Sequence, residues 1–171
     1  MPSSQRSTVT FRRVPADFSR RAIERFARRL QVEVAHGRPF DCLISGDAEL
    51  RRLNLKFLGH DYPTDVLSFP GVAPGILSPV TLRPRTTTGD KIAGATSSRL
   101  GDIAISFARA RTQARAFGHS AAQEVQILML HGLLHLLGMD HTADGGRMAR
   151  AEKRWRARLG LPTGLIERVR S

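Results

Sequence analysis

One segment, Leu130–Thr142, constrains the chemistry of this chain more than any other, and it reads LHGLLHLLGMDHT. His131 and His135 are four residues apart, so on a helix both imidazoles project from the same face. Gly138 can adopt the left-handed conformation that ends a helix and lets the chain turn back. That turn would bring His141 to the same place as a third nitrogen ligand.

Three histidines with an open fourth position are the ligand set of a catalytic rather than a structural zinc ion. The open position keeps a water molecule, and the metal lowers the pKa of that water. The spacing therefore predicts one Zn²⁺ per chain, bound by His131, His135 and His141. Two other histidines, His36 and His119, stand beside glycines in predicted loops and are interpreted as surface residues.

The residue after the first histidine distinguishes this motif from that of a peptidase. The metzincin peptidases share the spacing HxxxHxxGxxH, but they place a glutamate after the first histidine as general base. This chain has Gly132 there, and the nearby carboxylates are Glu124 and Asp140. Either could serve as a base or could orient a histidine ring. We assign His131 and Asp140 to the catalytic centre and favour Asp140 as a residue that orients a ring.

The composition is that of a globular protein with excess positive charge. The 171 residues are 41% hydrophobic and 25% charged, which fits one domain over 1–171. No apolar run reaches the roughly 18 residues of a membrane span, so we expect no membrane association. Because the lone Cys42 cannot close an internal disulfide, we expect a reducing, cytoplasmic location.

The charge points to a polyanionic partner. Lys and Arg total 27 against 15 Asp and Glu, a formal net charge of +12, which favours nucleic acid or a ribosome. Arginines crowd two segments, 20–29 and 147–158, and both are predicted to form helix faces. Aromatic residues are only 6% of the chain, so contacts to the nucleic-acid backbone should dominate over base stacking.

Hydrophobic patterning predicts alternating strands and helices. The predicted strands are Thr8–Val14, Phe40–Ser45, Asp65–Phe69 and Gly101–Ser106, the last two paired with each other. The predicted helices are Ala16–Val34, a helix from Asp47 through Phe57, Phe107–Phe117, Ala121–Leu137 and Asp144–Leu159. Between the last two predicted strands, residues 71–99 lack hydrophobic periodicity. This segment is predicted to be a flexible insertion, either a lid over a site or a segment without a role.

The histidine motif and three further segments resemble the YbeY family, the single-strand-specific endoribonucleases of ribosomal RNA maturation. The matching segments are LN at Leu53 and Asn54, DYPTDVLSFP at Asp61–Pro70, LGDIAIS at Leu100–Ser106 and HGLLHLLGMDH at His131–His141. Together with the order of the elements, they extend the resemblance from about residue 40 to residue 160.

The resemblance implies an α+β fold: a mixed sheet of about four strands, helices packed around it, and a zincin-like metal helix. It implies a cytoplasmic hydrolase with zinc on His131, His135 and His141. It further implies a role in 16S rRNA 3′-end maturation and ribosome quality control. The expected partners are ribosomal RNA, the ribosome or its small subunit, and assembly proteins.

One departure from the family concerns RNA binding. Family members carry an arginine, thought to engage the RNA, where this chain has Leu58. The RNA contacts at that place are therefore predicted to come from Lys56 and His60. The 71–99 insertion also exceeds the connection usual in the family, and Met139 stands where tyrosine is common.

Two alternatives remain open from the sequence. A zincin-type metallopeptidase fits the histidine spacing but lacks the glutamate at Gly132. A noncatalytic ribosome-assembly factor with a structural zinc fits the missing arginine at Leu58. For the nuclease, either water or the neighbouring ribose hydroxyl could attack the phosphorus.

Overall fold

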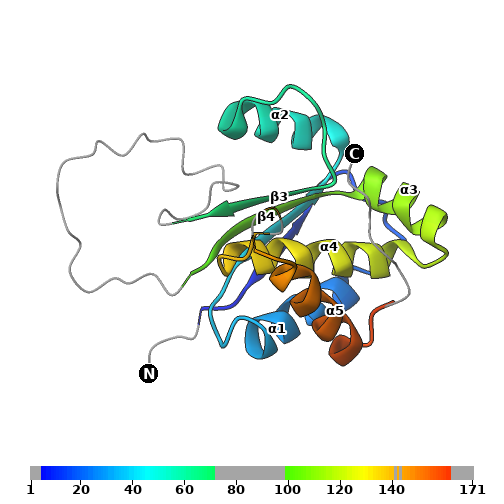
Figure 1. Ribbon diagram of the computed structural model, residues 1–171. Helices are drawn as coiled ribbons and strands as arrows, with labels where there is room; N and C mark the ends of the chain where they lie inside the picture. The colour runs from blue at the N-terminus through cyan, green and yellow to red at the C-terminus, as the bar shows by residue number, and fades with distance from the viewer. Residues whose placement is uncertain (1–4, 72–98, 141, 143, 163–171) are drawn as a thin grey trace.

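The structure, a computed structural model, describes residues 5–71, 99–140, 142 and 144–162. Its centre is a four-stranded sheet in the order β1-β2-β4-β3 (Figure 1). Strands β1, β2 and β4 run parallel, whereas β3 is antiparallel to β4 and forms one edge. The strands are β1 (Thr8–Phe11), β2 (Asp41–Ser45), β3 (Val66–Pro70) and β4 (Gly101–Ser106). The predicted mixed sheet and the predicted pairing of the last two strands are confirmed.

Five helices in the described part of the chain pack around this sheet, which confirms the predicted α+β class. They are α1 (Arg20–Glu33), α2 (Asp47–Leu58), α3 (Phe107–Phe117), α4 (Ala121–Leu136) and α5 (Arg147–Leu159). In Figure 1, α2 lies on one side of the sheet, and α1, α4 and α5 lie on the other. None of the helices in the described ranges is long and apolar enough to cross a membrane.

The two faces of the sheet bury cores of different size. The larger core joins α1, α4 and α5 to the sheet through residues such as Ile23, Ile103 and Leu128. The smaller core packs Leu50 and Leu53 of α2 against Leu67 and Phe69 of β3. Helix α4 is apolar around almost its whole circumference, because α1, α3, α5 and the sheet all pack against it.

Most element ends lie within one residue of the predicted ones; the exceptions are the end of β1, at Phe11 rather than Val14, and the starts of α1 and α5. Helix α1 begins at Arg20 rather than Ala16, because the residues after Pro15 form turns. Helix α2 begins at Asp47 as predicted, with Gly46 as its N-cap, and the side chain of Asp47 accepts a hydrogen bond from Ser106 Oγ at 2.6 Å. Helix α5 begins after Asp144, whose carboxylate accepts from the backbone N–H of Gly146 and Met148.

The insertion predicted over 71–99 lies outside the described residues except at its two ends. There, Gly71 donates to the carbonyl of Leu100 at 3.2 Å, directly beside the Pro70 and Gly101 pair of the sheet. The described chain thus enters and leaves the insertion at one edge of the sheet, at adjacent positions. The extent of the single predicted domain, 1–171, stays a prediction.

Candidate metal and hydrolase site

Helix α4 places two of the predicted ligands at its carboxyl end. Its start is fixed by a capping box, in which Ser120 and Gln123 each accept from the other's backbone N–H. Its last two turns present His131 and His135, and the chain turns away at Gly138, whose φ of +90° favours glycine. The predicted helix with both histidines on one face, ended by Gly138, is confirmed.

The two imidazoles converge. The Nε2 atoms of His131 and His135 lie 3.2 Å apart, and the ring planes are inclined by 74°. Two nitrogens that bind one tetrahedral zinc at about 2.0–2.1 Å are roughly 3.3–3.4 Å apart. The observed separation therefore fits two ligands of one such ion, and nitrogen donors of this type suit Zn²⁺.

His131 is held from its other side by a residue that the sequence analysis missed. Its Nδ1 lies 3.1 Å from Oε2 of Glu152 on α5, and Arg156 donates to the second carboxylate oxygen at 2.8 Å. Burial of Glu152 raises its pKa, but the hydrogen bond and charge of His131 and the charge of Arg156 outweigh this and lower the pKa to about 2. A carboxylate only accepts, so Nδ1 keeps its proton, and when the imidazole is neutral its lone pair is on Nε2.

A signal for Glu152 was present in the sequence. In the predicted helix Asp144–Leu159, Met148, Trp155 and Leu159 are spaced as one apolar stripe, and Glu152 falls on the same stripe. A carboxylate on an otherwise apolar face requires a partner. The identity of that partner depends on how α5 packs against α4, which periodicity alone does not give.

A cavity of about 410 Å³ opens next to the histidines. One wall is the face of β3 that carries Ser68, and the other is the end of α4 and the following turn. Asp140 also lines the cavity, and its carboxylate accepts from the backbone N–H and the hydroxyl of Thr142. The predicted residues His131, His135 and Asp140 thus meet at one cavity. The catalytic role of Asp140 stays a prediction.

The third predicted ligand, His141, lies outside the described residues. Among the residues that are described, no group of three His, Cys, Asp or Glu side chains is arranged to hold a metal. Zinc binding by all three histidines therefore stays a prediction.

Gly132 occupies the closest approach between α4 and the sheet. A Cβ atom at this position would lie 2.8 Å from Cγ2 of Ile103 and 3.1 Å from Oγ of Ser68. Ser68 also donates its hydroxyl proton to the carbonyl of Gly132 at 3.1 Å. The position that holds the general base in metzincins therefore faces the sheet here, without room for a side chain.

Glu124 lies away from the site. It is fully buried at the start of α4 and pairs with Nε2 of His119 at 2.5 Å. The interpretation of His119 as a surface residue is wrong, because its side chain is only 5% exposed. Glu124 needs this partner because a buried carboxylate without one would be strongly disfavoured.

Lys56 and His60 lie at the end of α2, which covers the opposite face of the sheet from α4 (Figure 1). His60 stacks near the ring of Tyr62, and Lys56 lies 5.2 Å from the centre of the Phe57 ring. Neither is among the described residues that line the cavity. The structure therefore does not bring them to the histidines, and their RNA contacts stay a prediction.

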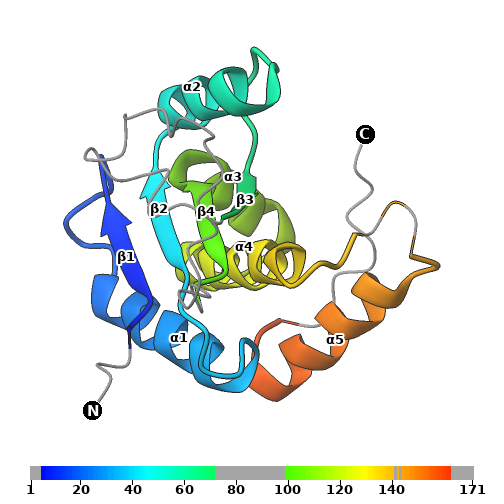
Figure 2. The ribbon, with the colours of Figure 1, turned by 90° about the vertical axis from the view of Figure 1, so that its left-hand side faces the viewer.

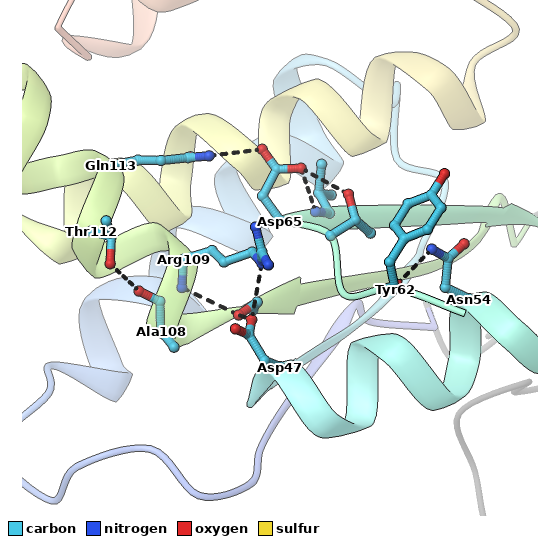
Figure 3. A network of polar contacts seen from close by, with 11 residues as sticks. Asp47, Asn54, Tyr62, Asp65, Ala108, Arg109, Thr112 and Gln113 are labelled. Atoms are coloured by element: carbon cyan, nitrogen blue, oxygen red, sulfur yellow. Dashed lines mark hydrogen bonds and ion pairs between the residues drawn. The ribbon is translucent and has the colours of Figure 1, made fainter. Parts of the chain in front are cut away.

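A polar network fixes the strand that forms one wall of the cavity (Figure 3). Asp65, just before β3, accepts from Gln113 of α3 at 3.2 Å, and its carbonyl accepts from the N–H of Ser106. Asn54 of α2 donates to the carbonyl of Tyr62 at 2.9 Å, which holds the loop after α2. These contacts lie within the Asp61–Pro70 segment, so its polar residues position β3 beside α4.

The comparisons with known proteins agree on one family. A family model described as Endoribonuclease YbeY matches residues 5–160. A protein named Endoribonuclease YbeY from Solibacter usitatus (strain Ellin6076) is 61% identical over 171 residues, all of both chains. Another of that name from Koribacter versatilis (strain Ellin345) is 36% identical over 154 residues, 90% of this chain and 86% of that protein.

A solved structure supports the fold independently. The solution structure of TM1509 from Thermotoga maritima matches 98% of this chain and 100% of its own, with a TM-score of 0.52 and 20% identity. The matched range of the family model includes every described element from β1 to α5. The histidine helix, the cavity beside it and the full-length similarity lead to one conclusion: the chain belongs to the Endoribonuclease YbeY family.

Proposed function

We propose that this protein is a zinc-dependent endoribonuclease, specific for single strands, that acts in 16S rRNA 3′-end maturation and ribosome quality control in the cytoplasm. Family membership supports the coarser part, an RNA-cleaving hydrolase. The observation that carries the metal-dependent part is the 3.2 Å approach of the His131 and His135 Nε2 atoms beside the cavity.

The residues would act as follows. His131, His135 and His141 would hold one zinc ion, which supplies charge to a phosphate oxygen and lowers the pKa of a bound water. Glu152 keeps the proton of His131 on Nδ1, so that Nε2 presents a lone pair. Asp140 is the one carboxylate among the described residues that line the cavity, and it can accept the proton of the attacking hydroxyl.

The bonds and protons balance in the same way for either nucleophile. A water or the neighbouring 2′-hydroxyl forms a bond to phosphorus and gives up its proton, and one ester oxygen leaves and takes up a proton. A 2′,3′-cyclic phosphate end in the product identifies the ribose route. A 3′-hydroxyl on one fragment and a 5′-phosphate on the other identify the water route.

The test combines metal analysis with cleavage of defined RNA. The purified protein is expected to hold one zinc per chain and to cut single-stranded, but not double-stranded, 16S rRNA fragments, with activity lost in chelator. His131→Ala should abolish cutting, whereas His36→Ala, a change at an exposed histidine, should not. Bound zinc and ribosome association without any cutting would instead identify an assembly factor.

The surroundings of Gly132 argue against the peptidase alternative. The wall formed by Ile103 and Ser68 leaves no room for the glutamate that a zincin peptidase places there. Cleavage of denatured casein that disappears with His135→Ala, together with intact RNA, would restore that alternative.

A further inference from the structure

In the described part of the chain, two helices on the same side of the sheet carry about half of the exposed Lys and Arg side chains. On α1, the middle of the exposed face holds Arg21, Arg25 and Arg28. On α5, the residues Arg147, Arg150, Arg154 and Arg158 lie three or four positions apart, which places them on one face, and all are exposed. We call these seven residues the basic band.

The two halves of the basic band meet. Arg29 of α1 donates to the carbonyl oxygens of Arg158 and Leu159, at 3.2 and 3.3 Å, which ties the end of α1 to the end of α5. Figure 2 shows the two helices meeting at these ends, with the other end of α5 next to the turn that follows α4. The basic band therefore runs from α1 along α5 toward the side of the molecule where α4 ends at the cavity.

The charge of the basic band is not neutralised within the described part of the chain. Arg21, Arg25, Arg28, Arg147 and Arg154 make no ion pair among the described residues. On α2, by contrast, the exposed Arg51 and Arg52 pair with Asp61 and Glu49. Cations four residues apart on a helix repel one another, so stability does not favour this pattern.

Arginine is the side chain best suited to this surface if the ligand is a phosphate chain. Its planar fork can donate two hydrogen bonds to one phosphate, and it stays charged at every physiological pH. A line of arginines matches the repeating phosphates of a nucleic-acid strand better than it matches one compact acidic group. Contacts to phosphates do not depend on the base sequence. The charge complementarity therefore favours a nucleic-acid backbone as the occupant.

We propose that the basic band binds the phosphate backbone of the RNA substrate outside the cavity and holds a long strand while the cavity acts on it. This inference rests on the proposed function. It assigns the retention of long RNA to α1 and α5 and not to the end of α2, where Lys56 and His60 lie.

The experiment measures binding separately from cleavage. A labelled single-stranded RNA of about 30 nucleotides, longer than a single binding groove spans, is titrated with the full chain in chelator at several salt concentrations. The variants are R21Q/R25Q, R147Q/R154Q and their combination. The matched control is R111Q/R115Q. It removes two exposed cations of α3 that are four residues from each other.

Each double variant of the basic band is expected to weaken binding about tenfold. It should also reduce the slope of log K against log salt by about 1.4, since each lost phosphate contact on a single strand contributes about 0.7. The combined variant should lose about twice as much slope. Cutting of a dinucleotide, which has one phosphodiester for the cavity and no further backbone phosphate for the basic band, should change little in kcat/KM.

Three results would overturn the proposal. One is an equal loss in R111Q/R115Q, which would show an effect of net charge alone. Another is unchanged RNA binding in the combined variant. The third is binding of the wild type to vesicles of anionic phospholipid, lost in the combined variant, while RNA binding persists. RNA binding is measured in chelator, where no cleavage is required. A protein that binds RNA through the basic band but never cuts it would therefore contradict the nuclease function and not this proposal.

Discussion

His131 and Glu152 are joined across two helices that meet only through tertiary packing, with 3.1 Å between Nδ1 of the imidazole and the carboxylate oxygen. Arg156 holds the same carboxylate from within α5. The imidazole is thus fixed in both tautomer and orientation before any metal binds. This preorganisation is what a metal ligand needs, and it can be tested without reference to RNA.

The first prediction concerns zinc affinity. Glu152→Gln removes the charge that keeps the proton on Nδ1 of His131, so zinc affinity should fall about 10- to 100-fold. Competition with a chromophoric chelator measures this directly in the absence of substrate. Glu33→Gln, on the exposed end of α1, is the matched control and should bind zinc like the wild type. Equal affinities in both variants would remove Glu152 from the metal site.

The second prediction concerns acid stability of the metal-free protein. The pKa of Glu152 is lowered from 4.5 to about 2 in the folded state, so its ionised form favours folding. Its contribution, roughly 3 kcal/mol, should be almost complete above pH 4.5 and lost as the pH falls toward 2. Urea unfolding should show a large difference between wild type and Glu152→Gln at pH 6 and a smaller one at pH 3. A difference independent of pH would contradict the assignment.

The third prediction concerns the contact between α4 and the sheet. Gly132→Ala places a Cβ 2.8 Å from Ile103 Cγ2, and this crowding should cost about 1–3 kcal/mol, offset by roughly 1 kcal/mol of helix propensity. A net loss of about 1 kcal/mol is expected from urea unfolding. In an Ile103→Ala background the same change should cost less, because the clashing methyl is gone. Strict additivity of the two changes would refute the crowding.

The sequence was informative where a single element decides the outcome. The position of His131 and His135 on one helix face follows from spacing, and the strand pairing of Asp65–Phe69 follows from the short apolar runs. Glu152 and the partner of His119 depend on contacts between elements far apart in the chain. The place of Lys56 and His60 depends on which face of the sheet α2 covers, and periodicity does not encode that choice.

The fourth prediction concerns the lone thiol. Cys42 is 2% exposed in the middle of the sheet, and burial, together with the charges of Asp41 and Asp102, raises its pKa far above the usual range. The thiolate is the reactive species, so the folded protein should resist modification by Ellman's reagent at pH 8. One thiol per chain should react once guanidinium unfolds the protein. Rapid reaction of the folded chain would show that β2 opens locally.

The last prediction concerns the strand ends that flank the insertion. Arg99 bridges Asp41 of β2 and Asp102 of β4, and Asp102 is completely buried. Replacing Arg99 by Met removes one cation from that carboxylate, at a cost of about 3 kcal/mol, because a buried pair that loses one partner is destabilised more than a pair that loses both. Arg51→Met breaks the exposed pair with Asp61 and is the matched control, expected to change the unfolding free energy little. The double change R99M/D102L should regain part of the loss. If R99M alone is as stable as R51M, the bridge does not hold these strands together.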